Sequence, residues 1–313
     1  MKKSVIIALG GNALSPKKEA GTINQQFAHT RQSLESIMHF ISLGYKICLT
    51  HGNGPQVGDE LYRMHLTHNT IPALPLGVCV AETQGSIGYM IQQSLQNALK
   101  HKLIDREVVT LITQTIIDKN DPSIKNPEKF IGRCYKEEEA KILAEQFGWI
   151  IKEQNTDEWR QVVPSPLPKY IEHGRSIETL VNSGTIVIAS GGGGIPAYWN
   201  ENDSLEGIDA VIDKDLSAAL LGRVIKANEL WIITDIDCAY LNYGKKEERP
   251  LNKISTSEAK LYYEQGHFQA GSMGPKFKAA LYFLKHHGDK VVITSIDGVK
   301  KAINDDFGTI INN

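Results

Sequence analysis

The stretch TIVIASGGGGIPAYWNENDSLEGIDAVIDKD, residues 185–215, decides the fold predicted for this chain. Its apolar run 186–189 indicates a buried strand that ends in four consecutive glycines, 191–194. Glycine lets backbone N–H groups approach an anion in conformations that a Cβ forbids. Asp213, Lys214 and Asp215 then open an apolar-periodic stretch typical of a helix, whose positive end favours a phosphate. Each of these two features also has an ordinary interpretation. The four glycines can form a simple sharp turn, and the acidic residues can simply begin a helix.

Two further predicted strands run into glycine-rich loops. The run 5–9 leads into Gly10, Gly11 and Asn12, and the run 46–50 leads into the loop 51–58. The rest of the chain alternates between the two patterns, with strands expected at 107–117, 229–234, 289–295 and 308–312 and helices at 23–43, 78–100, 256–265 and 275–287. Such alternation predicts an α/β fold with a mainly parallel sheet and helices on both faces. Because ligands bind beyond the carboxyl ends of parallel strands, we expect the three glycine loops to meet at one ligand site.

The segment 118–170 interrupts this alternation. It contains several prolines, a short helix signal at 136–146, and strand-like pieces around 149–151 and 160–163. Its length argues against a simple connection between two elements of the sheet. We interpret it as a lid or a protruding subdomain.

Composition excludes several classes of protein. The 313 residues are 41% hydrophobic with a net charge of −2, so no overall basic field indicates nucleic acid or an anionic membrane as a partner. The four cysteines are scattered without a C-x-x-C spacing, which favours free thiols in a reducing compartment. The apolar run after Met1 is too short for a signal peptide or a membrane span. These observations predict a cytoplasmic protein.

The glycine loops, together with three lysines elsewhere in the chain, favour phosphoryl transfer as the reaction. The chain has no G-x-x-x-x-G-K-[ST], no G-x-G-x-x-G after its first strand and no protein-kinase motifs. It does place Lys129, Lys214 and Lys276 near glycine or helix-start signals, although any one of them is more commonly a solvated surface charge. Glycine amides, lysines and a magnesium ion stabilise the negative charge of a phosphoryl transition state. A site without a committed histidine or cysteine suits phosphorylation of a carboxylate-like group, which needs no general base.

Eight motifs together resemble the carbamate kinases, a branch of the amino-acid-kinase superfamily. In chain order they are VIIALGGNAL, LTHGNGPQVG, ETQGSIGYMIQQ, KFIG, RQVVPSPLP, IASGGGGIP, AVIDKDLSAALL and GHFQAGSMGPK. The resemblance implies one amino-acid-kinase domain over 1–313, an open αβα sandwich around a mainly parallel sheet, with a small lid-like subdomain protruding at 118–170. It also implies a homodimer that transfers a phosphoryl group reversibly between ATP plus carbamate and ADP plus carbamoyl phosphate. Mg²⁺ accompanies the nucleotide, and the usual setting is ATP formation in arginine or allantoin-type catabolism.

The resemblance also implies roles for individual residues. Those that would hold the phosphoryl group and the carbamate are Gly10, Gly11, Asn12, Gly52, Asn53 and Gly54. Lys129 would reach carbamoyl phosphate from the subdomain, Lys214 and Lys276 would neutralise phosphate charge, and Asp215 would orient those two lysines. Residues that would contact the nucleotide are Gly193, Gly194, Thr234, Asp235, Tyr243, Met273 and Gly274. The ligands of the magnesium ion stay unassigned.

The chain departs from the family pattern within the subdomain. Phe130 and Arg133 stand where the family usually has prolines, and 156–158 replaces a glycine–arginine–glycine run with Thr-Asp-Glu. A related kinase for another acyl or carbamoyl group is therefore one alternative. A nucleotide-binding sensor without turnover is a second alternative, although a pure binder has no need of all three lysines. An assay of ATP formation from ADP and carbamoyl phosphate separates the three.

Overall fold

The centre of the fold is a single large sheet in a computed structural model, which describes residues 2–11, 21–268, 273–304 and 307–313. Within these residues the sheet has eight strands in the order β15-β17-β16-β12-β1-β2-β9-β3. Their bounds are β1 (Ser4–Leu9), β2 (Lys46–His51), β3 (Val108–Thr110), β9 (Ile186–Ile188), β12 (Glu229–Thr234), β15 (Lys253–Ser255), β16 (Lys290–Ser295) and β17 (Thr309–Asn312). All neighbours pair in parallel except β16 and β17. The predicted α/β class and mainly parallel sheet are confirmed.

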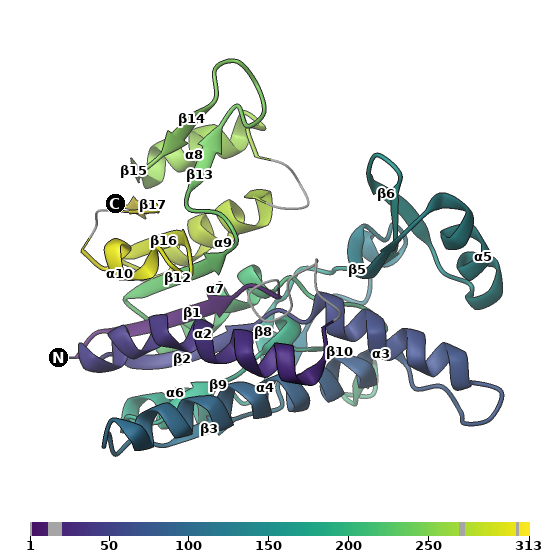
Figure 1. Cartoon of the computed structure of the whole chain (residues 1–313), viewed down its shortest axis with the longest axis horizontal. Helices are drawn as coiled ribbons and strands as arrows, with labels where there is room; N and C mark the ends of the chain where they lie inside the picture. The colour runs from purple at the N-terminus through teal and green to yellow at the C-terminus, as the bar shows by residue number, and fades with distance from the viewer. Residues whose placement is uncertain (1, 12–20, 269–272, 305–306) are drawn as a thin grey trace.

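Helices cover both faces of this sheet (Figure 1). They are α2 (Ile23–Ser42), α4 (Leu76–His101), α6 (Gly174–Ser183), α7 (Lys214–Ile225), α8 (Thr256–Glu264), α9 (Met273–Lys285) and α10 (Val299–Ala302). Helix α3 (Gly54–Thr67) instead packs against α4 and against β5 (Lys129–Tyr135), beside the main sheet. Every residue of β1 is buried, because a parallel strand between two helical layers has no solvent-facing side. One core packs α7 and α9 on the face with Ile6, and the other packs α2 and α4 on the face with Ile7.

The strand predicted at 107–117 is wrong as one continuous element. Its first part, β3, closes the main sheet, and its second part, β4 (Gln114–Ile116), belongs to a smaller sheet ordered β11-β10-β4-β8. Between them the Gln84 side chain hydrogen-bonds both the N–H and the C=O of Thr113, at 2.8 and 3.0 Å. A side chain from α4 thus takes the place of a neighbouring strand, and the chain leaves the main sheet. The other strands of the smaller sheet are β8 (Tyr170–Ile171), β10 (Ile195–Trp199) and β11 (Leu205–Gly207).

Part of the segment 118–170 forms a separate three-stranded sheet ordered β5-β7-β6. Its elements are β5 (Lys129–Tyr135), α5 (Glu137–Phe147), β6 (Ile151–Asn155) and β7 (Glu158–Val163). Figure 1 shows these elements standing away from the main sheet beside α3. We call residues 129–163 the protruding segment.

The protruding segment is joined closely to α3. A Cβ on Gly58 of α3 would lie 2.1 Å from the Gly132 Cα of β5, so the two backbones touch there. Arg133 pairs with Asp59 at 2.8 Å, and the Trp149 indole donates to His65 Nδ1 at 2.8 Å. Contacts of this kind set the position of β5 relative to the main body.

The remaining elements are short. They are the hairpin of β13 (Ala239–Leu241) and β14 (Arg249–Leu251) and the 3₁₀ turns η1 (Pro122–Ile124) and η2 (Gly191–Gly193). Among the described residues no helix is both long and apolar enough to cross a membrane. The four cysteines are free, as the sequence predicts, and all but Cys134 are buried.

Candidate functional site

The three glycine loops meet at a cavity of about 350 Å³ beyond the carboxyl ends of β1, β2 and β9. Gly10, Gly52 and Gly192 each contribute to its wall, one from each loop. The convergence predicted from the sequence is confirmed. Other residues on the wall are Gly11, Asn53, Gly54, Lys129, Gln154, Arg160, Asp213, Lys214, Asp215, Thr234, Asp235 and Lys276. Asn12 lies outside the described residues.

The first two loops require glycine because their backbones approach closely. A Cβ on Gly52 would lie 2.8 Å from the Gly11 nitrogen. The N–H groups of Gly10 and Gly52 donate to Ile233 and Leu9 carbonyls, both at 2.9 Å, and so continue the hydrogen bonding of the sheet. These two N–H groups are therefore already engaged, and the two residues serve the close approach of the loops.

The third loop packs tightly behind the cavity. Gly192 has φ +64°, and a Cβ there would lie 2.3 Å from Asn53 Nδ2. Gly193 and Gly194 also have positive φ, and a Cβ on them would lie 2.5 Å from the Ile212 carbonyl oxygen and 2.0 Å from Thr115 Oγ1. Only glycine fits at such positions. The structure thus brings Gly192 to the cavity wall and places the predicted nucleotide residues Gly193 and Gly194 behind it.

Asp215 joins two of the predicted lysines at the start of α7. Its Oδ1 accepts a hydrogen bond from Lys214, and its Oδ2 accepts one from Lys276 at 3.2 Å. Burial opposes ionisation of Asp215, but Lys214 and Lys276 lower the pKa of its carboxyl below the ordinary value. Burial also lowers the pKa of Lys214, against the effect of Asp215. For Lys276 burial acts downward too, yet Asp215 and Asp213 raise its pKa. A carboxylate thus fixes two ammonium groups at one wall of the cavity.

The third lysine comes from the protruding segment. Lys129 begins β5, and its Nζ lies 2.7 Å from Asp213 Oδ2 on the main body. Burial opposes ionisation of Asp213, but Lys129 and then Lys214 lower the pKa of its carboxyl well below the usual range. The structure therefore brings Lys129, Lys214, Asp215 and Lys276 to one cavity, although their elements are far apart in sequence.

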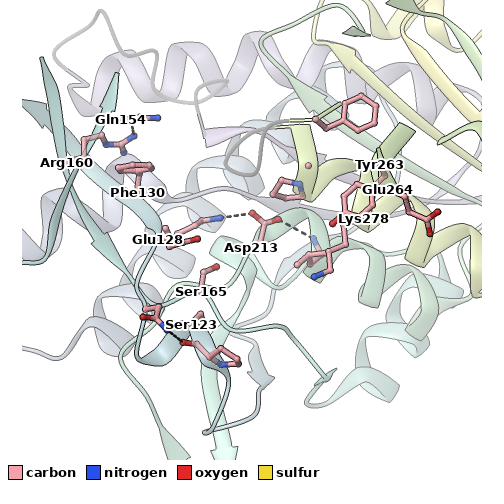
Figure 2. Close-up of a pocket in the computed structure, with 17 residues that line it drawn as sticks. Ser123, Glu128, Phe130, Gln154, Arg160, Ser165, Asp213, Tyr263, Glu264 and Lys278 are labelled. Carbon is pink, nitrogen blue, oxygen red and sulfur yellow. Dashed lines mark hydrogen bonds and ion pairs between the residues drawn. The ribbon is translucent and has the colours of Figure 1, made fainter. Parts of the chain in front are cut away.

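A second cavity of about 880 Å³ adjoins the first and shares Lys129, Gln154, Arg160 and Asp213 with it. It lies between the protruding segment and the α8–α9 region. Figure 2 shows Asp213 between Glu128 and Phe130 on one side and Tyr263, Glu264 and Lys278 on the other. The two cavities together give room for two ligands that meet near the lysines.

The predicted nucleotide residues are divided between these places. Thr234 and Asp235 line the smaller cavity, and Gly274 lines the larger one. Met273 begins α9, and its side chain packs against a hydrophobic core. Tyr243 is 67% exposed, with its ring 6.1 Å from that of Tyr240. Tyr243 does not belong to the described residues that line the two cavities.

Sequence reasoning missed Asp213 and Arg160 as site residues. Asp213 reads as an ordinary helix N-cap, and only its contact with Lys129 indicates more. Arg160 is 8% exposed on β7, where its Nη atoms donate to Gln154 and to the Gly132 carbonyl at 2.9 and 2.7 Å. Among the described residues no carboxylate lies within 4 Å of it, and its buried Nε has no hydrogen-bond partner. The sequence around an arginine in a strand does not indicate that its side chain is buried beside a cavity.

The acidic residues that depart from the family pattern lie where β6 is joined to β7. Asp157 lies in a turn with φ +61° and pairs with Lys136 at 2.5 Å. Glu158 accepts a hydrogen bond from Asn155 at 2.7 Å. Within the described part of the chain neither one lines either cavity. These two residues therefore leave the charge of the site unchanged at contact range.

Comparison with known proteins gives consistent relatives over the full chain. The sequence profile of the Amino acid kinase family matches residues 3–295. The chain is 46% identical over 311 residues to the carbamate kinase of Pyrococcus horikoshii, covering 99% of both chains. It is 41% identical over 309 residues to that of Trichomonas vaginalis, covering 98% of both. The structure of carbamate kinase from Giardia lamblia bound to citric acid superposes with a TM-score of 0.94 at 40% identity, covering 99% of this chain and 98% of that one. The Giardia lamblia enzyme bound to AMP-PNP gives 0.89 at 42% identity, with the same coverage.

Proposed function

This chain belongs to the amino acid kinase family and, within it, to the carbamate kinases, and we propose that it transfers a phosphoryl group reversibly between ATP plus carbamate and ADP plus carbamoyl phosphate. The observation that carries the proposal is Asp215 holding Lys214 and Lys276 beside the glycine loops. Two fixed cations at a cavity of about 350 Å³ suit a small anion that loses or gains a phosphoryl group.

The reaction needs positioning and charge more than covalent chemistry. The carbamate oxygen is already an anion, so it attacks the terminal phosphorus of ATP without a general base. Lys214 and Lys276 stabilise the negative charge that spreads over the phosphoryl oxygens as the bond to ADP breaks. Asp215 supports both ammonium groups in the same geometry throughout, so little reorganisation accompanies the step. The reverse reaction uses the same groups, with carbamoyl phosphate as the donor.

Lys129 would contact the carbamoyl end from the opposite side. It comes from the protruding segment, which we propose acts as a lid over the second substrate. Enclosure of this end would keep water from a labile acyl phosphate. The nucleotide would lie along Thr234, Asp235 and Gly274, which line the two cavities on the side of β12 and α9.

Magnesium fits this site as a companion of the nucleotide. Among the described residues no group of three histidine, cysteine or acidic side chains forms a metal cage. Mg²⁺ commonly binds through one or two carboxylates together with substrate phosphates and water. Asp235 lines the smaller cavity, and its carboxylate offers the oxygen donor that this ion prefers, whereas the carboxylates of Asp213 and Asp215 are engaged with lysines. When bound, the ion would neutralise charge on the phosphates of the nucleotide.

Three further parts of the proposal rest on the resemblance and on composition. We propose ATP synthesis in arginine or allantoin-type catabolism as the physiological direction, a homodimer as the assembly, and the cytoplasm as the location. Sedimentation analysis of the purified protein tests the assembly, and growth of a deletion strain on arginine or allantoin tests the direction.

The function is tested by a coupled assay of ATP formation from ADP and carbamoyl phosphate. We expect a kcat/KM at least about tenfold above that with acetyl phosphate, which corresponds to about 1.4 kcal/mol. Acetyl phosphate lacks the amino group, so buried acceptors would lose their partner. Equal rates with the two acyl phosphates would favour a kinase with another substrate. No ATP from carbamoyl phosphate at any magnesium concentration would contradict the proposal, and a protein that still binds ADP would then be a nucleotide sensor.

A further inference from the structure

Asp213 has two separate contacts at the N-terminus of α7. Its Oδ1 accepts hydrogen bonds from the backbone N–H groups of Asp215 and Leu216, at 2.9 and 3.4 Å. These bonds cap the helix in the ordinary way. Its Oδ2 accepts a hydrogen bond from Lys129 Nζ at 2.7 Å. One carboxylate thus faces a helix on one side and an ammonium group on the other.

The contact with Lys129 joins two parts of the molecule. Lys129 belongs to the three-stranded sheet of the protruding segment, and Asp213 belongs to the main body. Both side chains are largely buried, with exposures of 28% and 16%, and both line the two cavities. Figure 2 shows Asp213 in the middle of the residues that line the larger cavity, with dashed contacts on both of its sides. The pair therefore lies where a second substrate would pass between the two parts.

We propose that Asp213 is a positioning residue, which holds the Lys129 ammonium at the transfer cavity in readiness for carbamoyl phosphate. Lysine carries its charge on a flexible four-carbon stem, and ordering that stem weakens binding when it happens only on ligand contact. A lysine already fixed by Asp213 meets the substrate without that loss. This inference rests on the proposed function for the identity of the substrate.

A matched substitution separates this role from helix capping. Asparagine caps helices about as well as aspartate and has nearly the same shape, so Asp213→Asn keeps the cap and removes the negative charge. We expect the KM for carbamoyl phosphate to rise about tenfold, with the KM for ADP and the thermal midpoint nearly unchanged. The control is Asp121→Asn, since Asp121 caps η1 through Ser123 at 2.9 Å and has no lysine within ion-pair distance among the described residues. An unchanged or lower KM for carbamoyl phosphate in Asp213→Asn would overturn the proposal.

A double-mutant cycle tests whether Asp213 acts through Lys129. If it does, Asp213→Asn should add nothing to the effect of Lys129→Met, because the group that it positions is already gone. The KM of the double variant for carbamoyl phosphate should then match that of Lys129→Met within a factor of about two. Effects that multiply would show that Asp213 acts on the substrate by another route, and would overturn the proposal.

Calorimetric titration with inorganic phosphate gives a readout that does not depend on turnover. In the absence of nucleotide, we expect Asp213→Asn to weaken phosphate binding several-fold relative to wild type, and to have no such effect in the Lys129→Met background. Wild-type protein that makes no ATP would defeat the proposed function, but this titration would still decide the role of Asp213. Equal or tighter phosphate binding by Asp213→Asn would show that its charge repels the anion, which overturns the proposal.

Discussion

Lys214 and Lys276 share one carboxylate, so their charges are fixed before any ligand arrives. We expect Lys214→Ala and Lys276→Ala each to lower kcat by about 10²–10³, the usual cost of removing a preorganised charge-stabilising group. The KM for ADP should change far less, because the lysine charge matters most in the transition state. Steady-state kinetics in the direction of ATP formation measure both parameters.

The control for these variants is Lys285→Ala, an exposed lysine at the end of α9. It should leave kcat within a factor of about two. Wild-type turnover in either Lys214→Ala or Lys276→Ala would show that phosphoryl transfer occurs elsewhere.

His51 makes stability depend on pH. Burial lowers its pKa to about 4, so the ring stays neutral in the folded protein while the unfolded chain takes up a proton near pH 6.5. Between pH 6.5 and pH 4 the unfolded state binds more protons than the folded state. The contribution of His51 to the free energy of unfolding is therefore nearly complete at pH 7 and is lost as the pH falls. We expect the free energy of unfolding to decrease by roughly 2 kcal/mol from His51 between pH 7 and pH 5.

Urea unfolding at the two pH values measures this decrease, with His51→Gln as the comparison. His65, whose pKa is lowered by burial and by His68, acts in the same direction and is retained in both proteins. The difference between the proteins therefore isolates His51. An equal decrease in wild type and His51→Gln would mean that His51 already accepts a proton in the folded state.

The meeting of the three glycine loops follows from the sequence because each loop comes directly after a predicted strand. The roles of the individual glycines and lysines rest on the family resemblance. The residues that sequence reasoning misses act through contacts that no local pattern records. Asp213 has the sequence context of any helix cap, and its partner Lys129 lies 84 positions away. Arg160 faces the cavities only because β7 pairs with β5 in a register that its own residues do not specify.

At the scale of elements, the helix and strand predictions hold wherever periodicity runs over many residues. The range 107–117 differs because a tertiary contact, the Gln84 side chain on Thr113, divides an apolar run that has a single strand pattern. The attachment of β5 to α3 is likewise unseen in the sequence, since Gly58 and Gly132 look like ordinary loop and strand glycines. Their importance lies in how closely the two backbones touch.

The contact between α3 and β5 predicts the effect of a single methyl group. Gly58→Ala would place a Cβ 2.1 Å from the Gly132 Cα, so the protruding segment must shift. We expect a loss of about 1–3 kcal/mol in unfolding free energy, as for other overpacked contacts. We also expect a several-fold rise in the KM for carbamoyl phosphate, because Lys129 moves with β5. Urea unfolding and steady-state kinetics measure the two effects.

Gly85→Ala is the matched control, because Gly85 lies in α4 and a Cβ there meets no atom within 4 Å. It should leave the KM unchanged and raise stability by up to about 1 kcal/mol, through higher helix propensity. Equal kinetics in Gly58→Ala and Gly85→Ala would separate the position of β5 from substrate binding.

At the scale of the whole molecule, the proposed site draws its lysines from three regions of the chain. The main sheet brings Lys214 and Lys276 to one of its edges, and the protruding segment brings Lys129 to the same place. The general position of the site follows from sequence, because parallel strands end together. The strand order does not follow from sequence. Strand β1 lies between β2 and β12, and no local pattern in the sequence identifies β12 as its neighbour on the second side. That neighbour is remote: the Ser4 amide donates to Asn228, 224 positions further along the chain.

The position of β1 has a consequence for synthesis on the ribosome. Strands β2, β9 and β3 can add to β1 on one side early, but its other edge stays open until β12 emerges. We expect a fragment of residues 1–225 to aggregate, because it leaves the edge of a strand that is apolar from Val5 to Leu9 without a partner. Sedimentation and circular dichroism of this fragment check the expectation, and a soluble fragment with cooperative unfolding would contradict it. The nascent chain is therefore most exposed to misassembly between the appearance of β1 and that of β12, which is the interval in which a chaperone would be most useful.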